Sequence, residues 1–231
     1  MNELTTALAF CKTNEKLYVD MEQCISRGDA KILYASETAL FMYDIPSGIA
    51  MLAGENEHEL EQILSSVSPE IIKAQNGLIV SHGETVRDAV KKYYPCKDTY
   101  TACYQVVFTS KTPISLSGAL RYEKTTRETL DIIEATYDRE SKENLEKLSA
   151  QGKIYCAFTK DTDEFVGFIG RHPEGSMGLL LIFPEYRRHG YAEELEGYMT
   201  NVILSEGKVP YAHIIEDNYK SQNLQKKLGF D

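Results

Sequence analysis

Positive charge and small residues coincide in the segment Phe183-Pro184-Glu185-Tyr186-Arg187-Arg188-His189-Gly190-Tyr191-Ala192. Pro184 lacks a backbone N–H and ends the pairing of the apolar strand before it. Arg187 and Arg188 add positive charge. Gly190 and Ala192 let a ligand approach the first turn of the following helix, whose free N–H groups and dipole favour an anion. The segment predicts a diphosphate-binding loop; the alternative is a plain strand-to-helix turn with solvated arginines.

Two further side chains in this part of the chain have types that catalysis can use. Cys156 lies in the apolar run Lys153–Thr159, which favours a buried, inert thiol over a nucleophile. His213 lies in the apolar run Val209–Ile215 and shares a face with Tyr211 and Ile215, because strand side chains alternate. Histidine changes charge near neutral pH, so His213 suits proton transfer, with packing against a helix as the alternative.

The elements that must position these residues follow from hydrophobic spacing and turn residues. We expect helices over Thr126–Tyr137 and Ser141–Ala150, strands over Lys153–Thr159, Glu164–Arg171 and Met177–Phe183, a helix from about Gly190 to Leu204 that ends at Gly207, the strand Val209–Ile215, and a last short helix that Asn218 caps.

The N-terminal part shows a similar order of elements. We expect one or two helices within residues 3–26, an antiparallel meander over Lys31–Ala35, Ala39–Tyr43 and Gly48–Leu52, a helix over His58–Val67, a strand over Leu78–Val80, a helix over Glu84–Tyr94, and a strand over Tyr104–Thr109 that closes this half. A Ser, Thr, Lys and Pro stretch then predicts a linker. It divides the chain into domains 1–112 and 113–231. A helix between neighbouring strands implies a parallel pair, so we predict an α/β fold with mixed sheets and consider an internal duplication.

Composition excludes several other classes of protein. The 231 residues are 42% hydrophobic and 26% charged, which is too apolar for a disordered chain. The net charge of -10 without a basic face argues against nucleic acid or an anionic membrane as a partner. Five widely spaced cysteines, with no metal-ligand spacing and no apolar leader segment, predict a soluble protein of the reducing cytoplasm without a metal site.

Two motifs in the C-terminal part carry a resemblance to a known family. Arg187, Gly190 and Ala192 fill the pattern [Q/R]-x-x-G-x-[G/A], which resembles the acyl-CoA loop of the GNAT superfamily of N-acyltransferases. A later segment is similar to the family's second signature. It has Asn218, Ser221 and Leu224, followed by Lys227-Leu228-Gly229-Phe230. The resemblance covers residues from about 118 to 231. It implies a GNAT-like fold, an acyl-CoA co-substrate and an amine acceptor, with CoA contacts at Ile182, Phe183, Arg187, Arg188, His189, Gly190, Tyr191, Ala192, Asn218 and Ser221.

Within the superfamily, the glycine N-acyltransferase branch resembles this chain most. That branch has a Pro-Glu-Tyr-Arg-x-His-Gly run followed by the equivalents of Tyr211, His213 and Asn218, and it carries a degenerate N-terminal copy of the fold. Residues 1–112 are expected to be such a copy. Their corresponding loop, Gly54-Glu55-Asn56-Glu57-His58-Glu59, holds carboxylates that would repel a diphosphate. We therefore expect the C-terminal half alone to bind CoA.

The chain departs from the resemblance at two positions that bear on catalysis. Gln225 stands where many GNAT enzymes have a tyrosine that protonates the leaving thiolate, and Ser176 stands where the branch has a glutamate proposed as base. Glu174 is nearby, although Pro173 and Gly175 predict a turn there. Tyr191 and Tyr219 are either acids or surface aromatics. His213 is our expected base, with Glu174 and Ser176 as further candidates.

The resemblance implies direct transfer of an acyl group from acetyl-CoA or another acyl-CoA to the amine of a small molecule or amino acid. A backbone N–H near Ile182 would hold the developing oxyanion. Acetylation of a protein or peptide amine is one alternative. A CoA-binding regulatory protein that has lost turnover is another.

Overall fold

The computed structural model describes residues 2–68, 77–94 and 100–231, so Cys96 lies outside the described residues. The chain forms two compact units, Met1–Ala102 and Cys103–Asp231. This division precedes the expected one after Thr112, because the strand that we assigned to the end of the first half belongs to the sheet of the second unit.

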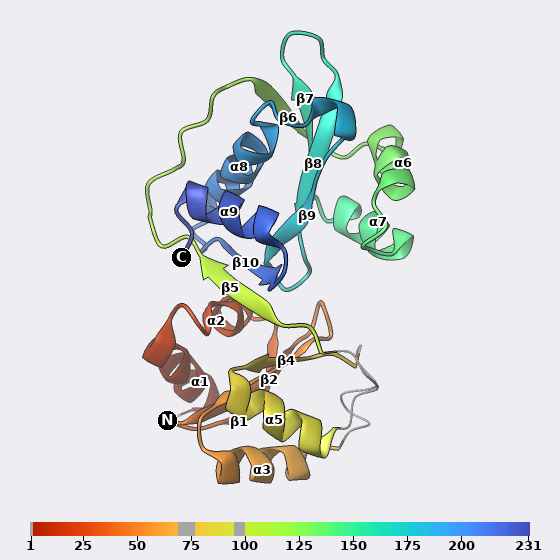
Figure 1. Cartoon of the computed structure of the whole chain (residues 1–231). Coiled ribbons are helices and arrows are strands. Elements are labelled where there is room, and N and C mark those ends of the chain that lie inside the picture. The colour runs from red at the N-terminus through yellow and green to blue at the C-terminus, as the bar shows by residue number, and fades with distance from the viewer. Residues whose placement is uncertain (1, 69–76, 95–99) are drawn as a thin grey trace. The chain divides into compact units, whose positions relative to one another are not determined.

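The second unit is a mixed sheet between two layers of helices (Figure 1). Its elements are β5 (Cys103–Val107), β6 (Leu120–Lys124), α6 (Arg127–Thr136), α7 (Lys142–Ala150), β7 (Ile154–Thr159), β8 (Phe165–Arg171), β9 (Met177–Ile182), the 3-10 turn η2 (Pro184–Tyr186), α8 (Tyr191–Ser205), β10 (Tyr211–Ile215) and α9 (Tyr219–Leu228). The strand order is β5-β10-β9-β8-β7-β6, in which β9 and β10 alone run parallel. The helices and strands expected between Thr126 and the last helix are therefore confirmed, within a few residues at their ends.

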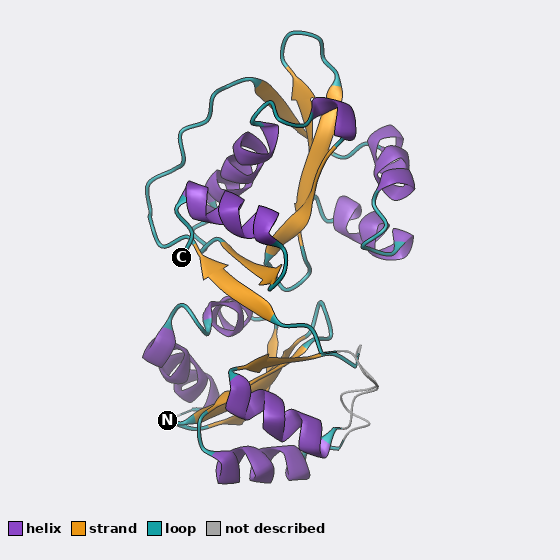
Figure 2. Cartoon of the chain, viewed as in Figure 1, coloured by secondary structure: helices purple, strands orange, loops and turns teal. Residues whose placement is uncertain are grey.

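Helices lie on both faces of this sheet (Figure 2), and two hydrophobic cores hold the layers together. The apolar stripe of α8, with Leu195, Met199 and Ile203, packs with residues of α9 on one face of the sheet. Leu130 and Ile133 of α6 pack with residues of α7 on the other face. Helices packed on both faces leave the ends of the central strands, rather than a face of the sheet, as the place for a ligand.

The edge strand β5 corrects our assignment of Tyr104–Thr109 to the N-terminal half. It pairs antiparallel with β10 from Cys103↔Ile215 to Tyr211↔Val107. Val107 also exchanges backbone hydrogen bonds with Asp231, with N···O distances of 2.8 and 3.1 Å. The segment before the linker thus provides the strand that follows β10 at the sheet edge.

The first unit has the same order of elements from its paired helices onward. It comprises α1 (Glu3–Cys11), the 3-10 turn η1 (Lys12–Asn14), α2 (Val19–Ser26), β1 (Ala30–Ala35), β2 (Ala39–Asp44), β3 (Ala50–Gly54), α3 (Glu57–Ser66), β4 (Ile79–His82) and α5 (Glu84–Tyr93). Its sheet order is β1-β2-β3-β4, and the first three strands form the predicted meander. α1 and α2 cover one face of this sheet, and α3 and α5 cover the other.

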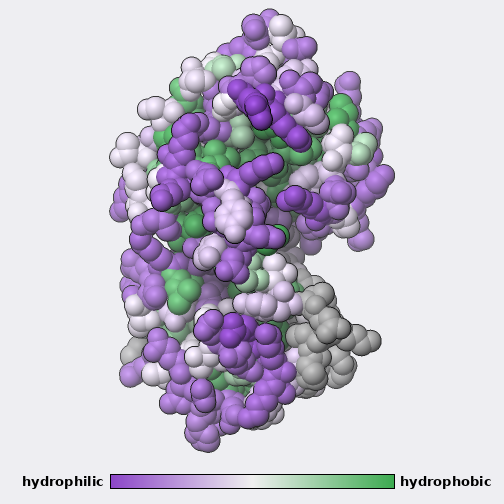
Figure 3. Space-filling model, in the orientation of Figure 1, coloured by the Kyte–Doolittle hydropathy of each residue, from purple (hydrophilic) through white to green (hydrophobic). Residues whose placement is uncertain are grey.

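The helices of the described residues were compared with the length and hydropathy that a membrane span needs. No helix in these ranges is long and apolar enough to cross a bilayer. The face of the molecule in Figure 3 is mainly hydrophilic, with hydrophobic side chains in small patches.

Candidate functional site

The second unit has an opening between its two parallel strands. β9 and β10 pair only at Met177↔Ala212, whereas β10 pairs with β5 at every position from Tyr211 to Ile215. Past this point β9 carries a bulge: its register with β8 shifts between Phe168 and Gly170, and Leu179 has φ of 52°. A bulge bends its strand. The bend accompanies the loss of pairing with β10, and it leaves one edge of β9 available to a ligand.

Backbone alternation directs the amide of Ile182 towards this free edge. Phe183 N–H donates to the Val166 carbonyl of β8 at 3.0 Å. Successive residues of a strand direct their N–H and C=O groups to opposite edges, so those of Ile182 are directed away from β8. The Ile182 carbonyl accepts from Arg187 Nε at 3.1 Å on that side. The position suits an N–H donor for a substrate carbonyl, as we predicted.

The N-terminus of α8 has no side-chain cap, in contrast to its neighbours. Side chains of Thr126, Ser141 and Asn218 cap α6, α7 and α9, but the N-cap of α8 is Gly190 with φ of 81°. A Cβ added at Gly190 would meet no protein atom within 4 Å. The N–H groups of the first turn are therefore open to an anion, which is the chemistry predicted for this loop.

A cavity of about 440 Å³ lies in front of this helix end. Its walls are Ile182 at the end of β9, the residues around η2 and the start of α8, and residues of α9. The predicted CoA residues that line it, besides Ile182, are Arg187, Arg188, Gly190, Tyr191 and Ala192; from α9 come Asn223, Leu224 and Lys227. The cavity joins the free edge of β9 to the helix end.

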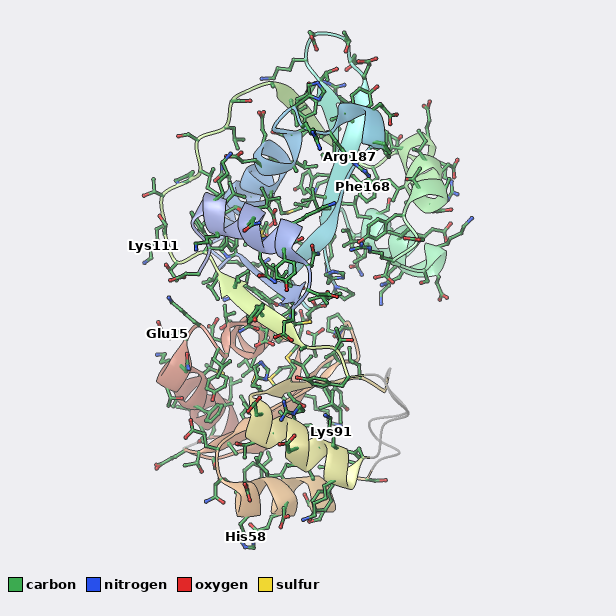
Figure 4. All side chains as sticks on the ribbon, viewed as in Figure 1. Glu15, His58, Lys91, Lys111, Phe168 and Arg187 are labelled. Atoms are coloured by element: carbon green, nitrogen blue, oxygen red, sulfur yellow. The ribbon has the colours of Figure 1, made fainter. Side chains whose placement is uncertain are left out.

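The remaining residues predicted to contact CoA have mainly structural contacts. Phe183 is buried in the core beneath α6 and α7, edge-on to Phe165. His189 Nδ1 lies 3.1 Å from the Tyr186 carbonyl, and its ring stacks on Tyr191. Asn218 Oδ1 accepts the Ser221 N–H at 3.3 Å, as the predicted cap does. Arg187 folds back onto β9 near the top of Figure 4.

The candidate catalytic residues gather at the start of β9, beside its one pairing with β10. His213 Nε2 lies 2.7 Å from Gln105 Oε1 of β5, so the ring faces its neighbour strand. Ser176 Oγ donates to the carboxylate of Glu174, and both residues are buried. The Tyr211 hydroxyl donates to the Glu174 carbonyl at 3.0 Å. The predicted turn is confirmed, because β9 begins only at Met177.

Sequence reasoning missed His172, which lies in the same turn. Its Nε2 lies so close to Gly178 that a Cβ at this position would clash with the ring. A glycine inside a strand often marks a close approach of another group. Gly178 was therefore the signal that would have drawn attention to this histidine.

Gln225 is a structural residue rather than an acid. It is 3% exposed, and its Nε2 donates to Glu196 of α8. Burial raises the pKa of Glu196 to about 8. Since Gln225 Oε1 is buried without a partner among the described residues, a neutral Glu196 carboxyl completes a reciprocal acid–amide pair between α8 and α9. The pair therefore joins two helices that both line the cavity.

A second buried glutamate, Glu194, anchors the first turn of α8. Its carboxylate accepts from the Leu120 N–H at 3.0 Å, from the Tyr122 hydroxyl at 3.1 Å and from the Ser117 hydroxyl. The Glu194 carboxylate is therefore directed to β6 and away from the cavity. The sequence alone did not predict this role of Glu194, because a glutamate on a helix is ordinarily exposed.

Cys156 has the inert role that we favoured. Its side chain is buried, and burial raises the pKa of the thiol to about 11. The thiolate is the nucleophilic form, so Cys156 stays unreactive at neutral pH.

The C-terminal part of the chain matches a family model, and several solved structures share the fold. Residues 154–231 match a family model described as FR47-like protein. A GCN5-related N-acetyltransferase from Sphaerobacter thermophilus is 12% identical, with a TM-score of 0.53 over 99% of this chain and 90% of that one. A GNAT-family acetyltransferase from Colwellia psychrerythraea is 11% identical, with a TM-score of 0.52 over 100% and 94%. The chain has the GNAT fold.

A third solved structure also overlaps with nearly the whole of this chain. A Drosophila protein is 14% identical, with a TM-score of 0.66 over 99% of this chain and 92% of that one. No curated protein matched the sequence. The similarity in fold thus extends over nearly the whole chain, while the similarity in sequence stays low.

Proposed function

We propose that this protein is an N-acetyltransferase that uses acetyl-CoA and acetylates the amine of a small molecule or amino acid. The observation that carries the proposal is the uncapped end of α8 beside the free edge of β9, joined by one cavity. The GNAT fold supports it. The resemblance of Tyr211, His213 and Asn218 to the glycine N-acyltransferase branch favours a small acceptor over a protein amine.

The residues present fit acetyl-CoA by charge and by space. Acetyl-CoA would supply the acetyl group as a thioester. The backbone from Arg188 to Ala192 would hold the diphosphate, because the N–H groups there lack a cap and Gly190 leaves room. The Ile182 N–H would stabilise the oxyanion. A base near the start of β9 would take the proton of the acceptor amine.

Release of free thiol tests this function. We expect the protein to release CoA thiol from acetyl-CoA when it is given a panel of free amino acids and primary amines, and to do so at a lower rate with peptides. Preferred acetylation of peptide N-termini or lysines would move the assignment to the protein acetyltransferase alternative. Tight binding of acetyl-CoA with no thiol release from any acceptor would leave the non-catalytic alternative.

We further propose that the first unit is a degenerate copy of the same fold. Both units place two helices before three antiparallel strands, a helix, a parallel strand and a last helix. In the first unit, however, β3 and β4 pair at four successive positions from Ala50↔Ile79 to Ala53↔His82. His82 Nδ1 also lies 3.2 Å from the Leu52 carbonyl across the two strands. This sheet therefore lacks the opening found between β9 and β10.

The corresponding helix end in the first unit is also occupied. The Asn56 side chain accepts the Glu59 N–H and caps α3, and Glu57 and Glu59 add negative charge. We therefore predict one CoA molecule bound per chain. Calorimetric titration with CoA measures the stoichiometry directly, and two sites per chain would contradict the assignment of the first unit.

A further inference from the structure

We propose that His172, rather than His213, is the base that takes the proton from the acceptor amine; this rests on the proposed acetyl transfer. Gly178 is the first residue of β9 past the single pairing with β10. As a glycine, it has no side chain to cover its own backbone. The imidazole of His172 packs against that space instead, with Nε2 too close to the ideal Cβ position for any larger residue to fit there.

This placement puts His172 on the side of the sheet where His213 lies. Met177 and Ala212 are in register and both belong to the core beneath α8. Because side chains alternate along a strand, the next residues, Gly178 and His213, both face the opposite side. The two imidazoles therefore lie at the same end of the opening, one above β9 and one on β10.

The two rings differ in their hydrogen bonds. His213 Nε2 faces the amide oxygen of Gln105 at 2.7 Å, and an amide oxygen only accepts, so this nitrogen carries a hydrogen. Neither ring nitrogen of His172 bonds to another group within the described part of the chain. Its side chain is partly buried, so a substrate can reach it. A ring nitrogen without another hydrogen-bond partner, beside the opening, is what a base requires.

The backbone around His172 is held rigidly, as a positioned base needs. Its N–H donates to the Ser176 carbonyl at 2.9 Å, and its carbonyl accepts from Gly175 N–H at 3.0 Å. Tyr211 donates to the Glu174 carbonyl at 3.0 Å, and Lys153 Nζ donates to the Pro173 carbonyl at 3.0 Å. The turn is thereby anchored to β10 and to the start of β7.

Each proton in the transfer has a defined origin and destination. An N–H bond of the acceptor ammonium breaks and its proton moves to His172 Nε2. The amine nitrogen forms a bond to the acyl carbon, and the C–S bond breaks with its electron pair on sulfur. The imidazolium returns its proton to the thiolate, and the second proton of the amine leaves to solvent as the amide forms.

The decisive experiment combines His172→Gln, which keeps a polar side chain but cannot accept a proton, with His213→Gln as the matched control. With an amine that the wild-type protein acetylates, we expect His172→Gln to lower kcat by roughly a hundredfold, with acetyl-CoA affinity unchanged. His213→Gln should lower it by less than about tenfold, because its role would be positioning. A wild-type kcat in His172→Gln would overturn the proposal.

Gly178→Ala tests the placement without touching either histidine. A methyl group at this position should displace the imidazole, so kcat should fall in the wild-type background and not fall further in His172→Gln. Equal effects in both backgrounds would contradict the proposal, because they would show that the methyl group acts independently of the ring.

A readout that needs no acceptor separates this proposal from the proposed function. The chain has five histidines, so the ring NMR signal missing from His172→Gln identifies that residue. Addition of acetyl-CoA should shift this signal. Binding of acetyl-CoA without any shift would overturn the placement of His172 alone, whereas a wild-type protein that neither binds acetyl-CoA nor releases thiol would refute the proposed function itself.

Discussion

Gly190→Val is expected to weaken acetyl-CoA binding by roughly tenfold or more, about 1.4 kcal/mol. Gly190 adopts φ of 81° at the uncapped end of α8 and lines the cavity. A β-branched residue is strained in this region of φ, and its methyl groups would enter the space that the diphosphate needs. Isothermal calorimetry with acetyl-CoA measures the change.

Gly207→Val is the matched control at the other end of the same helix. Gly207 has φ of 72°, and a Cβ there also meets nothing within 4 Å. The backbone strain is therefore similar, but the residue lies away from the cavity. Gly207→Val should bind acetyl-CoA as the wild-type protein does. Unchanged affinity in a folded Gly190→Val protein would remove the loop from the cofactor site.

Glu196→Gln is expected to stabilise the second unit at neutral and alkaline pH. Burial raises the pKa of Glu196 to about 8, well above the value of a glutamate in an unfolded chain. The folded state therefore holds a proton that the unfolded state releases. The contribution of this group to stability is fully present below about pH 4.5 and decreases as the pH rises to about 8, by a total on the order of 5 kcal/mol.

A glutamine at position 196 keeps the pairing with Gln225 and has no charge to bury. The difference in free energy of unfolding between Glu196→Gln and the wild-type protein should be near zero at about pH 4 and should grow up to about pH 8. Hydrogen exchange of α8 and α9 in denaturant measures it for this unit. Glu143→Gln, on the exposed face of α7, is the control that removes one carboxylate without this effect. A difference independent of pH would contradict a neutral Glu196.

The sequence by itself predicted the helices and strands from α6 to α9 and the loop that we propose to bind an anion. The signals were local: apolar spacing, Gly207 at the end of α8 and Asn218 at the start of α9. Local backbone preferences decide where a helix begins and ends. The positive residues and Gly190 identified the strand-to-helix loop for the same reason. The acidic start of α3 is likewise a local signal, from which we predicted that the corresponding loop of the first unit holds no diphosphate.

Only the tertiary structure decided which distant segments meet. The sheet partner of β10 comes from Cys103–Val107, and no local signal favoured this pairing over the N-terminal sheet. The Glu196–Gln225 pair and the ring of His172 above Gly178 depend equally on packing between separate elements. Residue types and spacing specify the conformation of a segment, but contacts across the sheet arise only when the whole core is assembled. The strand-to-helix loop was therefore predictable, and the contacts at the start of β9 were not.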